Sequence, residues 1–233
     1  MQQSNRTAAP LPDPPDAILF DLDGTLADSM TVIAEALVDT LARFGHTTTV
    51  EGLMPHFGPR MQEVISAATG VDLDEADRIY ADYLPRYYGE YMGRSRPLPG
   101  GDALLEALAP TGVPMGIVTS KIERGAHDLL AHLGWSEHFG VVVGRDTTPE
   151  MKPSPVPVRY ALDALDADPS RTVSVGDTEA DMQAASAAGV AAIIGLTVIR
   201  TPAQMLAAGA THTCEDLDAV RGLLLSALKA QPA

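Results

Sequence analysis

The segment Ile18-Leu-Phe-Asp21-Leu-Asp23-Gly-Thr-Leu-Ala-Asp-Ser29 joins an apolar run to two aspartates one residue apart and then to a glycine. The apolar run is typical of a buried strand, and the alternation of side chains along a strand places Asp21 and Asp23 on one side. Gly24 allows the backbone to leave the sheet sharply. Neighbouring carboxylates at a buried strand end repel each other and lose hydration unless a cation compensates. This segment therefore predicts a divalent-metal site.

Short apolar runs and helical patterns alternate along the rest of the chain. Four further runs, bounded by glycine, proline or polar residues, are typical of buried parallel strands: residues 115–119, 141–143, 172–175 and 191–194. Helical periodicity occupies residues 102–108, 124–133, 155–165, 181–188, 202–208 and 216–229. The alternation predicts an α/β fold built on a doubly wound parallel, Rossmann-like sheet with right-handed crossovers.

Residues 27–97 interrupt this alternation, because they contain helical periodicity and no strand-like run. Five of the six tyrosines fall within residues 80–91, at spacings of three and four that are typical of a core-facing helix stripe, so we interpret them as packing residues. We expect a disordered tail (residues 1–16), an α/β core domain (17–26 and 98–233) and an inserted small all-helical unit (27–97).

The composition excludes several classes of partner. The 233 residues include 16 basic and 31 acidic side chains, giving a formal charge of −15, which argues against a nucleic-acid or membrane partner. An anionic substrate needs local positive charge. The single cysteine, Cys214, cannot form an internal disulfide, and the sequence contains no pattern typical of a signal peptide or membrane span. We expect a cytoplasmic protein, either a monomer or a homodimer.

Polar residues suited to phosphate or metal end or follow the predicted strands. They are Asp21 with Asp23, Thr119 with Ser120, Lys152, and Asp177 with Asp181. A hydroxyl and turn N–H groups can hold an oxyanion, and the helix after Lys152 adds a dipole that favours anions. Asp177 and Asp181 are four apart and share a face if a helix starts there. All these groups are predicted to meet at the carboxyl edge of one sheet.

This ordered set resembles the haloacid dehalogenase superfamily, over the whole chain after the tail. The inserted helical unit is similar to the small cap of phosphoglycolate phosphatases and related small-phosphate phosphatases, which implies that residues 27–97 form a small all-helical cap domain. The resemblance implies that Asp21 is the nucleophile that forms an aspartyl-phosphate and that Asp23 is the general acid and base. It also implies a Mg²⁺ ion held by the Asp21 carboxylate, the Asp23 backbone carbonyl and the Asp177 carboxylate, with Asp181 orienting bound water.

The same resemblance implies phosphoryl-binding roles for Thr119, Ser120 and Lys152. In the insert, Arg60 opens a helix after a Gly-Pro loop, where it can reach a substrate carboxylate or second phosphate. The expected function is Mg²⁺-dependent hydrolysis of a small anionic phosphorylated metabolite, a phosphate monoester similar to phosphoglycolate.

Other reactions of the same superfamily are alternatives to this hydrolysis. Asp23 argues against dehalogenation, which has no alkoxide to protonate, and the lysine-free insert argues against Schiff-base phosphonate cleavage. A sugar-phosphate mutase of the β-phosphoglucomutase type stays open. Lys121 after Thr119-Ser120 resembles pyrophosphate-cleaving relatives, and the bulky apolar residues of 195–202 depart from the phosphoglycolate phosphatase pattern. A non-catalytic binding module is the remaining alternative.

Overall fold

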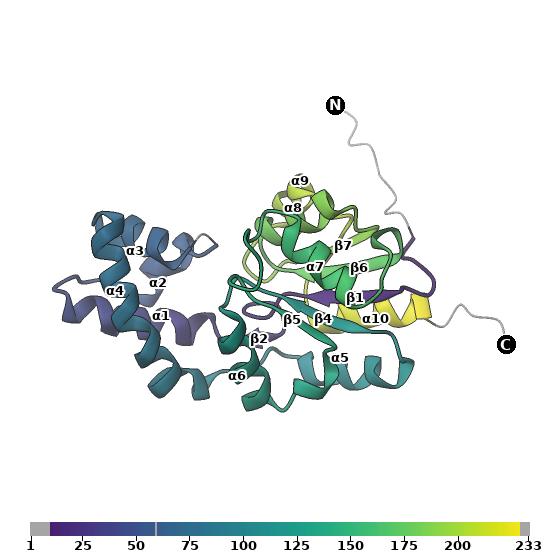
Figure 1. Cartoon of the computed structure of the whole chain (residues 1–233), viewed down its shortest axis with the longest axis horizontal. Coiled ribbons are helices and arrows are strands. Elements are labelled where there is room, and N and C mark those ends of the chain that lie inside the picture. Colours follow the sequence, from purple (N-terminus) through teal and green to yellow (C-terminus); the bar gives the residue numbers. More distant parts are fainter. Residues whose placement is uncertain (1–9, 59, 229–233) are drawn as a thin grey trace.

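A computed structural model describes residues 10–58 and 60–228 of the chain. Its main feature is a six-stranded, fully parallel sheet with the strand order β5-β4-β1-β6-β7-β8 (Figure 1). The strands are β1 (Ala17–Phe20), β4 (Met115–Val118), β5 (Val141–Val143), β6 (Thr172–Gly176), β7 (Ala192–Leu196) and β8 (His212–Cys214). Because β1 pairs with β4 on one side and β6 on the other, the carboxyl end of β1 lies in the middle of the sheet edge.

Helices cover both faces of the sheet. They are α5 (Gly101–Leu108), α6 (Glu123–Leu133), α7 (Val156–Ala164), α8 (Glu179–Ala188), α9 (Pro202–Ala208) and α10 (Leu217–Leu228). Ile18 and Phe20 pack with α5, α6 and α10, whereas Leu19 packs with α7, α8 and α9. Successive strand residues point to opposite faces, so a continuously apolar strand needs cover on both sides. The doubly wound α/β prediction is confirmed.

The edge strand β8 and a small two-stranded ribbon had no counterpart in the predicted strands. β8 contains His212 and Thr213 and therefore lacks the apolar signal of the central strands, yet it pairs in parallel with β7. The ribbon joins β2 (Ala27–Asp28) to β3 (Arg96–Pro97) in antiparallel pairing. It brings together the two ends of the helical insert, with Ala27 opposite Pro97 and Asp28 opposite Arg96.

Helices form the insert, which lies beside the sheet in Figure 1. It contains α1 (Met30–Arg43), α2 (Val50–Leu53), a 3₁₀ turn (Met54–His56), α3 (Met61–Thr69), α4 (Leu73–Arg86), a π-helical turn (Tyr87–Tyr91) and a 3₁₀ turn (Met92–Arg94). Leu37, Leu41 and Ile65 are buried in a separate apolar cluster of the insert. Asp72 caps α4 by accepting from the Glu75 N–H at 2.9 Å.

The predicted tail is described only from residue 10 onward, and residues 1–9 lie outside the described residues. Arg171 donates to the Asp16 carboxylate and to the Pro14 carbonyl, each at 2.7 Å, and Leu11 packs against the core. Residues 10–16 are thus attached to the α/β domain. Within 10–58 and 60–228, the helices are all too short or too polar to cross a membrane.

Candidate active site

Asp21 directly follows β1 and lies in a buried position at the sheet edge. Its N–H donates to the Val175 carbonyl at 2.9 Å, which continues the pairing with β6. Its Oδ1 accepts from Lys152 Nζ at 2.8 Å, although the two residues are 131 apart in sequence. Lys152 also donates to the Val118 carbonyl at 2.9 Å and to Asp181. One buried ammonium therefore links the ends of β1 and β4 to the start of α8.

The turn after Asp21 depends on Gly24, whose φ is +86°. A side chain there is disfavoured by conformation, and a Cβ would also lie 2.6 Å from Asp177 Oδ2. The next residue, Thr25, donates its hydroxyl to Asp177 Oδ1 at 2.8 Å. The turn thus approaches Asp177 closely and holds its carboxylate in place.

Asp23 lies on the same turn and has two polar partners. The Ser29 hydroxyl donates to Asp23 Oδ1 at 2.5 Å, and Lys121 Nζ lies 3.0 Å from Asp23 Oδ2. Lys121 also donates to the Tyr87 hydroxyl at 3.2 Å and lies 4.7 Å from the centre of its ring. This ion pair connects the turn after β1 with the loop after β4 and with the insert.

Asp177 and Asp181 meet through a capping turn, and not on one helix face as the sequence spacing had suggested. Helix α8 begins at Glu179, so Asp177 precedes its N-cap Thr178, while Asp181 lies in the first turn. Asp181 Oδ2 accepts from the Thr178 N–H at 2.9 Å and from its hydroxyl at 2.6 Å. The other oxygen of Asp181 accepts from Lys152 Nζ, so this carboxylate mainly holds the ammonium of Lys152 in position beside Asp21.

The carboxylates of Asp21, Asp177 and Asp181 form an acidic cluster, with oxygens within 4.8 Å of one another. Burial raises the pKa of Asp21 to about 6, with Lys152 acting in the opposite direction. Burial, with the charges of Asp21 and Asp181, raises the pKa of Asp177 well above its usual value. A single ammonium compensates three buried carboxylates, so this oxygen-rich cluster fits a hard divalent cation.

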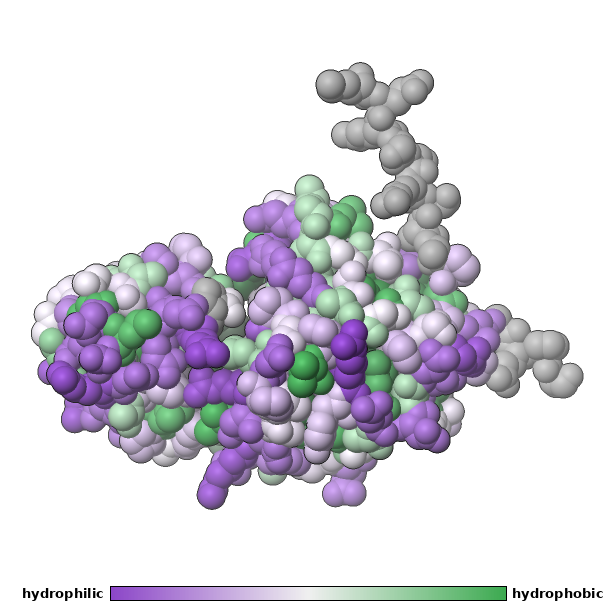
Figure 2. Space-filling view, turned by 45° about the horizontal axis from the view of Figure 1, so that its top comes forward, coloured by the Kyte–Doolittle hydropathy of each residue, from purple (hydrophilic) through white to green (hydrophobic). Residues whose placement is uncertain are grey.

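A cavity of about 150 Å³ lies between the acidic cluster and the insert. Its polar side contains the sheet-edge residues, whereas the insert contributes mainly apolar and aromatic side chains: Met30, Ile33, Met54, Phe57, Met61, Tyr80, Tyr83, Leu84, Tyr87 and Tyr88. Figure 2 shows a notch between the two bodies, flanked by hydrophilic surface. The arrangement suits a small molecule with an anionic end at the sheet.

Comparisons with known proteins agree with this geometry. The family model described as haloacid dehalogenase-like hydrolase matches residues 18–194. The chain belongs to the haloacid dehalogenase-like hydrolase family. A phosphoglycolate phosphatase of Cupriavidus necator is 35% identical over 229 residues, covering 94% of this chain and 97% of the relative. A phosphoglycolate phosphatase of Neisseria meningitidis is 35% identical, covering 74% and 77%.

Solved structures give the same family. A hydrolase of the haloacid dehalogenase-like family from Streptococcus pneumoniae has a TM-score of 0.77 at 26% identity and covers 88% of this chain and 96% of its own. The resemblance stated from the sequence is therefore confirmed, and the chain is a hydrolase.

The other predicted site residues of this haloacid dehalogenase-like hydrolase also line the cavity. Thr119 is buried, and its Oγ1 accepts from the Lys121 N–H at 3.2 Å. Ser120 is exposed beside it. Arg60 is exposed too, with Nε 3.3 Å from Met151 Sδ, and it lines both this cavity and an adjoining open groove. The structure thus brings the sequence-predicted residues together around one space.

Sequence reasoning did not assign Lys121, Arg145 or Arg200 of this hydrolase to the site, although all three line the cavity. From the sequence, Lys121 suggested only that pyrophosphate is an alternative substrate. In the structure its side chain is 5% exposed and pairs with Asp23. Arg145, from the loop after β5, lines the cavity and donates to the Tyr80 hydroxyl at 2.6 Å. The scarcity of lysine was a usable signal for Lys121, whereas no local pattern marked Arg145.

Four of the five tyrosines interpreted as packing residues line the cavity, and they differ in burial. Tyr83 and Tyr87 are buried in the insert with ring centres 5.6 Å apart. Tyr80 and Tyr88 are half-buried and contact the α/β domain, as the Tyr87 hydroxyl also does through Lys121. Tyr88 packs so closely on Gly125 of α6 that a Cβ there would lie 1.9 Å from its hydroxyl oxygen. The stripe therefore both packs the insert and forms one wall of the cavity.

Proposed function

We propose that this protein is a Mg²⁺-dependent phosphatase that hydrolyses a small phosphate monoester similar to phosphoglycolate through an aspartyl-phosphate. The observation that carries the proposal is the convergence of Asp21, Asp23, Lys152 and Thr119 on one cavity beside an acidic cluster. The relatives named phosphoglycolate phosphatase support the substrate class.

In the first step, a carboxylate oxygen of Asp21 attacks phosphorus in line with the leaving group. The bond from phosphorus to the alkoxide oxygen breaks as the bond to Asp21 forms, and Asp23 gives its proton to the alkoxide. In the second step, Asp23 takes a proton from water, which attacks the aspartyl-phosphate and releases inorganic phosphate and free Asp21. Ser29 and Lys121 hold the Asp23 carboxylate in place for both transfers.

Lys152 and Thr119, with Ser120 at the rim, are proposed to bind the oxygens of the transferring phosphoryl group. Two acidic partners outweigh the opposing effect of burial and raise the pKa of Lys152, so its ammonium stays charged. That charge reduces the repulsion between Asp21 and an anionic ester. Asp181 contributes by holding the ammonium, in addition to the water-orienting role expected from the sequence.

The Asp21 carboxylate, the Asp23 backbone carbonyl and the Asp177 carboxylate are the proposed Mg²⁺ ligands. Bound Mg²⁺ would neutralise charge on the phosphoryl oxygens. Thr25 and Gly24 position the Asp177 carboxylate for this task.

The insert, residues 27–97, is proposed to act as a cap domain on the core formed by 17–26 and 98–233. Its own apolar cluster and the ribbon of β2 and β3 at its base support this division. Arg60, at the rim, is proposed to contribute to substrate preference. We also propose a small anionic metabolite as the partner, because the cations Lys152 and Arg60 line the cavity, and a cytoplasmic location, because a single cysteine allows no internal disulfide.

The test is phosphate release by the purified protein with and without Mg²⁺. The panel contains phosphoglycolate, sugar phosphates, nucleotides, pyrophosphate and an aryl phosphate. We expect Mg²⁺-dependent release concentrated on a small monoester, complete loss in Asp21→Asn, and unchanged release in the control Asp163→Asn, whose side chain is exposed on α7. Preference for pyrophosphate, phosphoryl transfer between sugar hydroxyls, or no reaction at all would replace the proposal with the corresponding alternative.

A further inference from the structure

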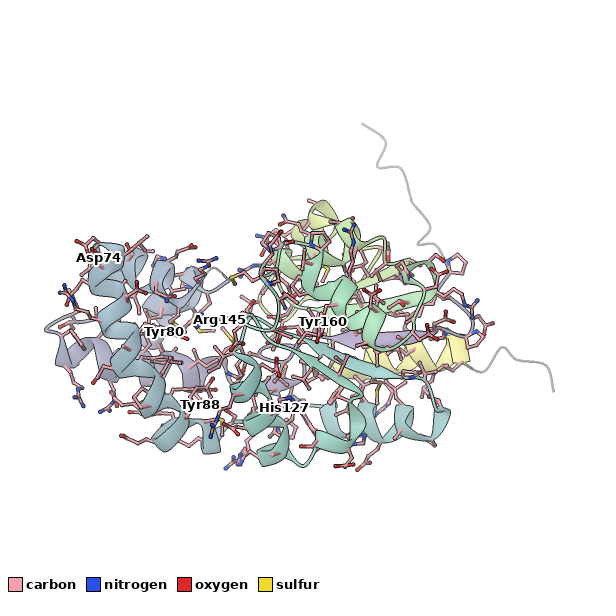
Figure 3. All side chains as sticks on the ribbon, in the orientation of Figure 1. Asp74, Tyr80, Tyr88, His127, Arg145 and Tyr160 are labelled. Carbon is pink, nitrogen blue, oxygen red and sulfur yellow. The ribbon has the colours of Figure 1, made fainter. Side chains whose placement is uncertain are left out.

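Arg145 is a cation in the cavity that the catalytic proposal does not use. It follows β5 and Gly144, and its Nη2 donates to the Tyr80 hydroxyl at 2.6 Å. Its guanidinium also lies 5.1 Å from the centre of the Tyr80 ring. Figure 3 shows the two side chains directed toward one another, Tyr80 from α4 of the insert and Arg145 from the α/β domain. The guanidinium is thus held at the boundary between the two bodies.

The charge of Arg145 is not neutralised by a neighbour. The other strongly held cations of the cavity have carboxylate partners: Lys152 with Asp21 and Asp181, Lys121 with Asp23, and Arg200 with Glu179 at 3.0 Å. Within residues 10–58 and 60–228, Arg145 makes no ion pair and has a phenol as its side-chain partner. A half-buried guanidinium without a counterion is a ready partner for an anionic group of a ligand.

The loop that carries Arg145 is fixed by a chain of hydrogen bonds. The Arg145 N–H donates to the Lys121 carbonyl at 2.9 Å, and the Gly144 N–H donates to Thr147 Oγ1 at 2.9 Å. The Thr147 hydroxyl donates to Glu123 Oε2 at 2.5 Å, and the Glu123 N–H donates to Asp146 Oδ1 at 2.7 Å. The guanidinium is therefore positioned before a ligand arrives, which lowers the entropic cost of binding.

We propose that Arg145, oriented by Tyr80, binds a carboxylate at the end of the substrate remote from the phosphate. The inference rests on the proposed function and adds to it the residue that recognises the acid group of a phosphoglycolate-like substrate. Lys152 and the metal ligands serve the phosphate end, Arg145 serves the acid end, and the apolar wall of the insert encloses the carbon atoms between them.

The test compares two esters of similar size, phosphoglycolate and 2-hydroxyethyl phosphate, in which a neutral CH₂OH replaces the carboxylate. Binding is measured by calorimetry with Mg²⁺ in the Asp21→Asn background, so that turnover is not required. We expect Arg145→Ala to lower the preference for phosphoglycolate over the neutral ester by about 10- to 100-fold, as for loss of a hydrogen bond to a charged group. Arg145→Lys should restore part of this preference, and Tyr80→Phe should lower it by a smaller factor.

Two controls separate recognition from a structural effect. Arg159→Ala removes an arginine outside the cavity that binds the Ala187 carbonyl, and it should leave the preference unchanged. Arg60→Ala tests the arginine at the rim. Equal weakening of both esters in Arg145→Ala, or a larger change of preference in Arg60→Ala, would overturn the assignment. The inference also fails if the Asp21→Asn parent binds the two esters equally well or binds neither of them. The phosphatase proposal is tested separately, by phosphate release from the wild-type protein.

Discussion

The buried pair of Lys121 and Asp23 provides a quantitative test of how the site is held together. The two side chains are 5% and 14% exposed, with Lys121 Nζ 3.0 Å from Asp23 Oδ2. Burial lowers the pKa of Lys121, but Asp23 and the phenols of Tyr87 and Tyr88 outweigh it and raise that pKa, so the ammonium stays charged. The perturbation is Lys121→Met, which keeps an unbranched apolar stem and removes the charge.

Removal of one partner from a buried ion pair typically costs about 3–5 kcal/mol, because the remaining charge is left uncompensated. Asp23 keeps the Ser29 hydroxyl and partial contact with water, so we expect about 2–3 kcal/mol. For a chain of this size, each kcal/mol shifts the melting temperature by about 2–4 °C, which gives a decrease of about 4–12 °C.

The assay is thermal unfolding of Lys121→Met, Asp23→Asn and the double variant, analysed as a double-mutant cycle. We expect a coupling free energy of about 2 kcal/mol, because the second substitution removes a charge that has already lost its partner. The matched control is Arg124→Met, whose side chain is 89% exposed and lies 3.8 Å from Asp128, and it should leave the melting temperature unchanged. Additive effects of the two single substitutions would refute the reasoning.

Three further predictions follow from other contacts. Thr25→Val removes the hydroxyl that binds Asp177, and we expect Mg²⁺ affinity measured by calorimetry to fall about tenfold; unchanged affinity would contradict this. Gly125→Ala places a methyl against Tyr88 and should raise KM, whereas addition of Tyr88→Ala should relieve the increase if the contact is the cause. Burial raises the pKa of Asp21 from 3.8 to about 6, so metal-free wild type should lose stability relative to Asp21→Asn as pH rises from about 4 to 6. The check is the melting temperature of both proteins as a function of pH. If the melting temperatures of wild type and Asp21→Asn changed by the same amount across that range, the Asp21 carboxyl would not contribute to the pH dependence of stability.

The fold and the positions of the main site residues were accessible from sequence, because the signals are local. The alternation of apolar runs with helical periodicity predicted the doubly wound sheet, and Gly24 after Asp21 and Asp23 marked where the chain leaves it. The spacing rule failed for Asp177 and Asp181, since it assumed a helix where a capping turn at Thr178 starts α8 two residues later. Their proximity was nevertheless predicted, because both follow one strand end.

Sequence alone predicted five of the six strands of the sheet, the helical periodicity of residues 27–97 and the sheet edge at which Asp21 and Lys152 meet. Hydrophobic periodicity and strand-end position are properties of contiguous residues, whereas the polar edge strand β8 has no such signal. The tertiary structure decided which charges are paired and which remain available. Lys121 is neutralised by Asp23, whereas Arg145 faces Tyr80, 65 residues earlier, without a carboxylate partner among the described residues. Such contacts depend on how the insert packs against the sheet domain, and side chains from distant segments set the charge and shape of the cavity only after that packing has formed.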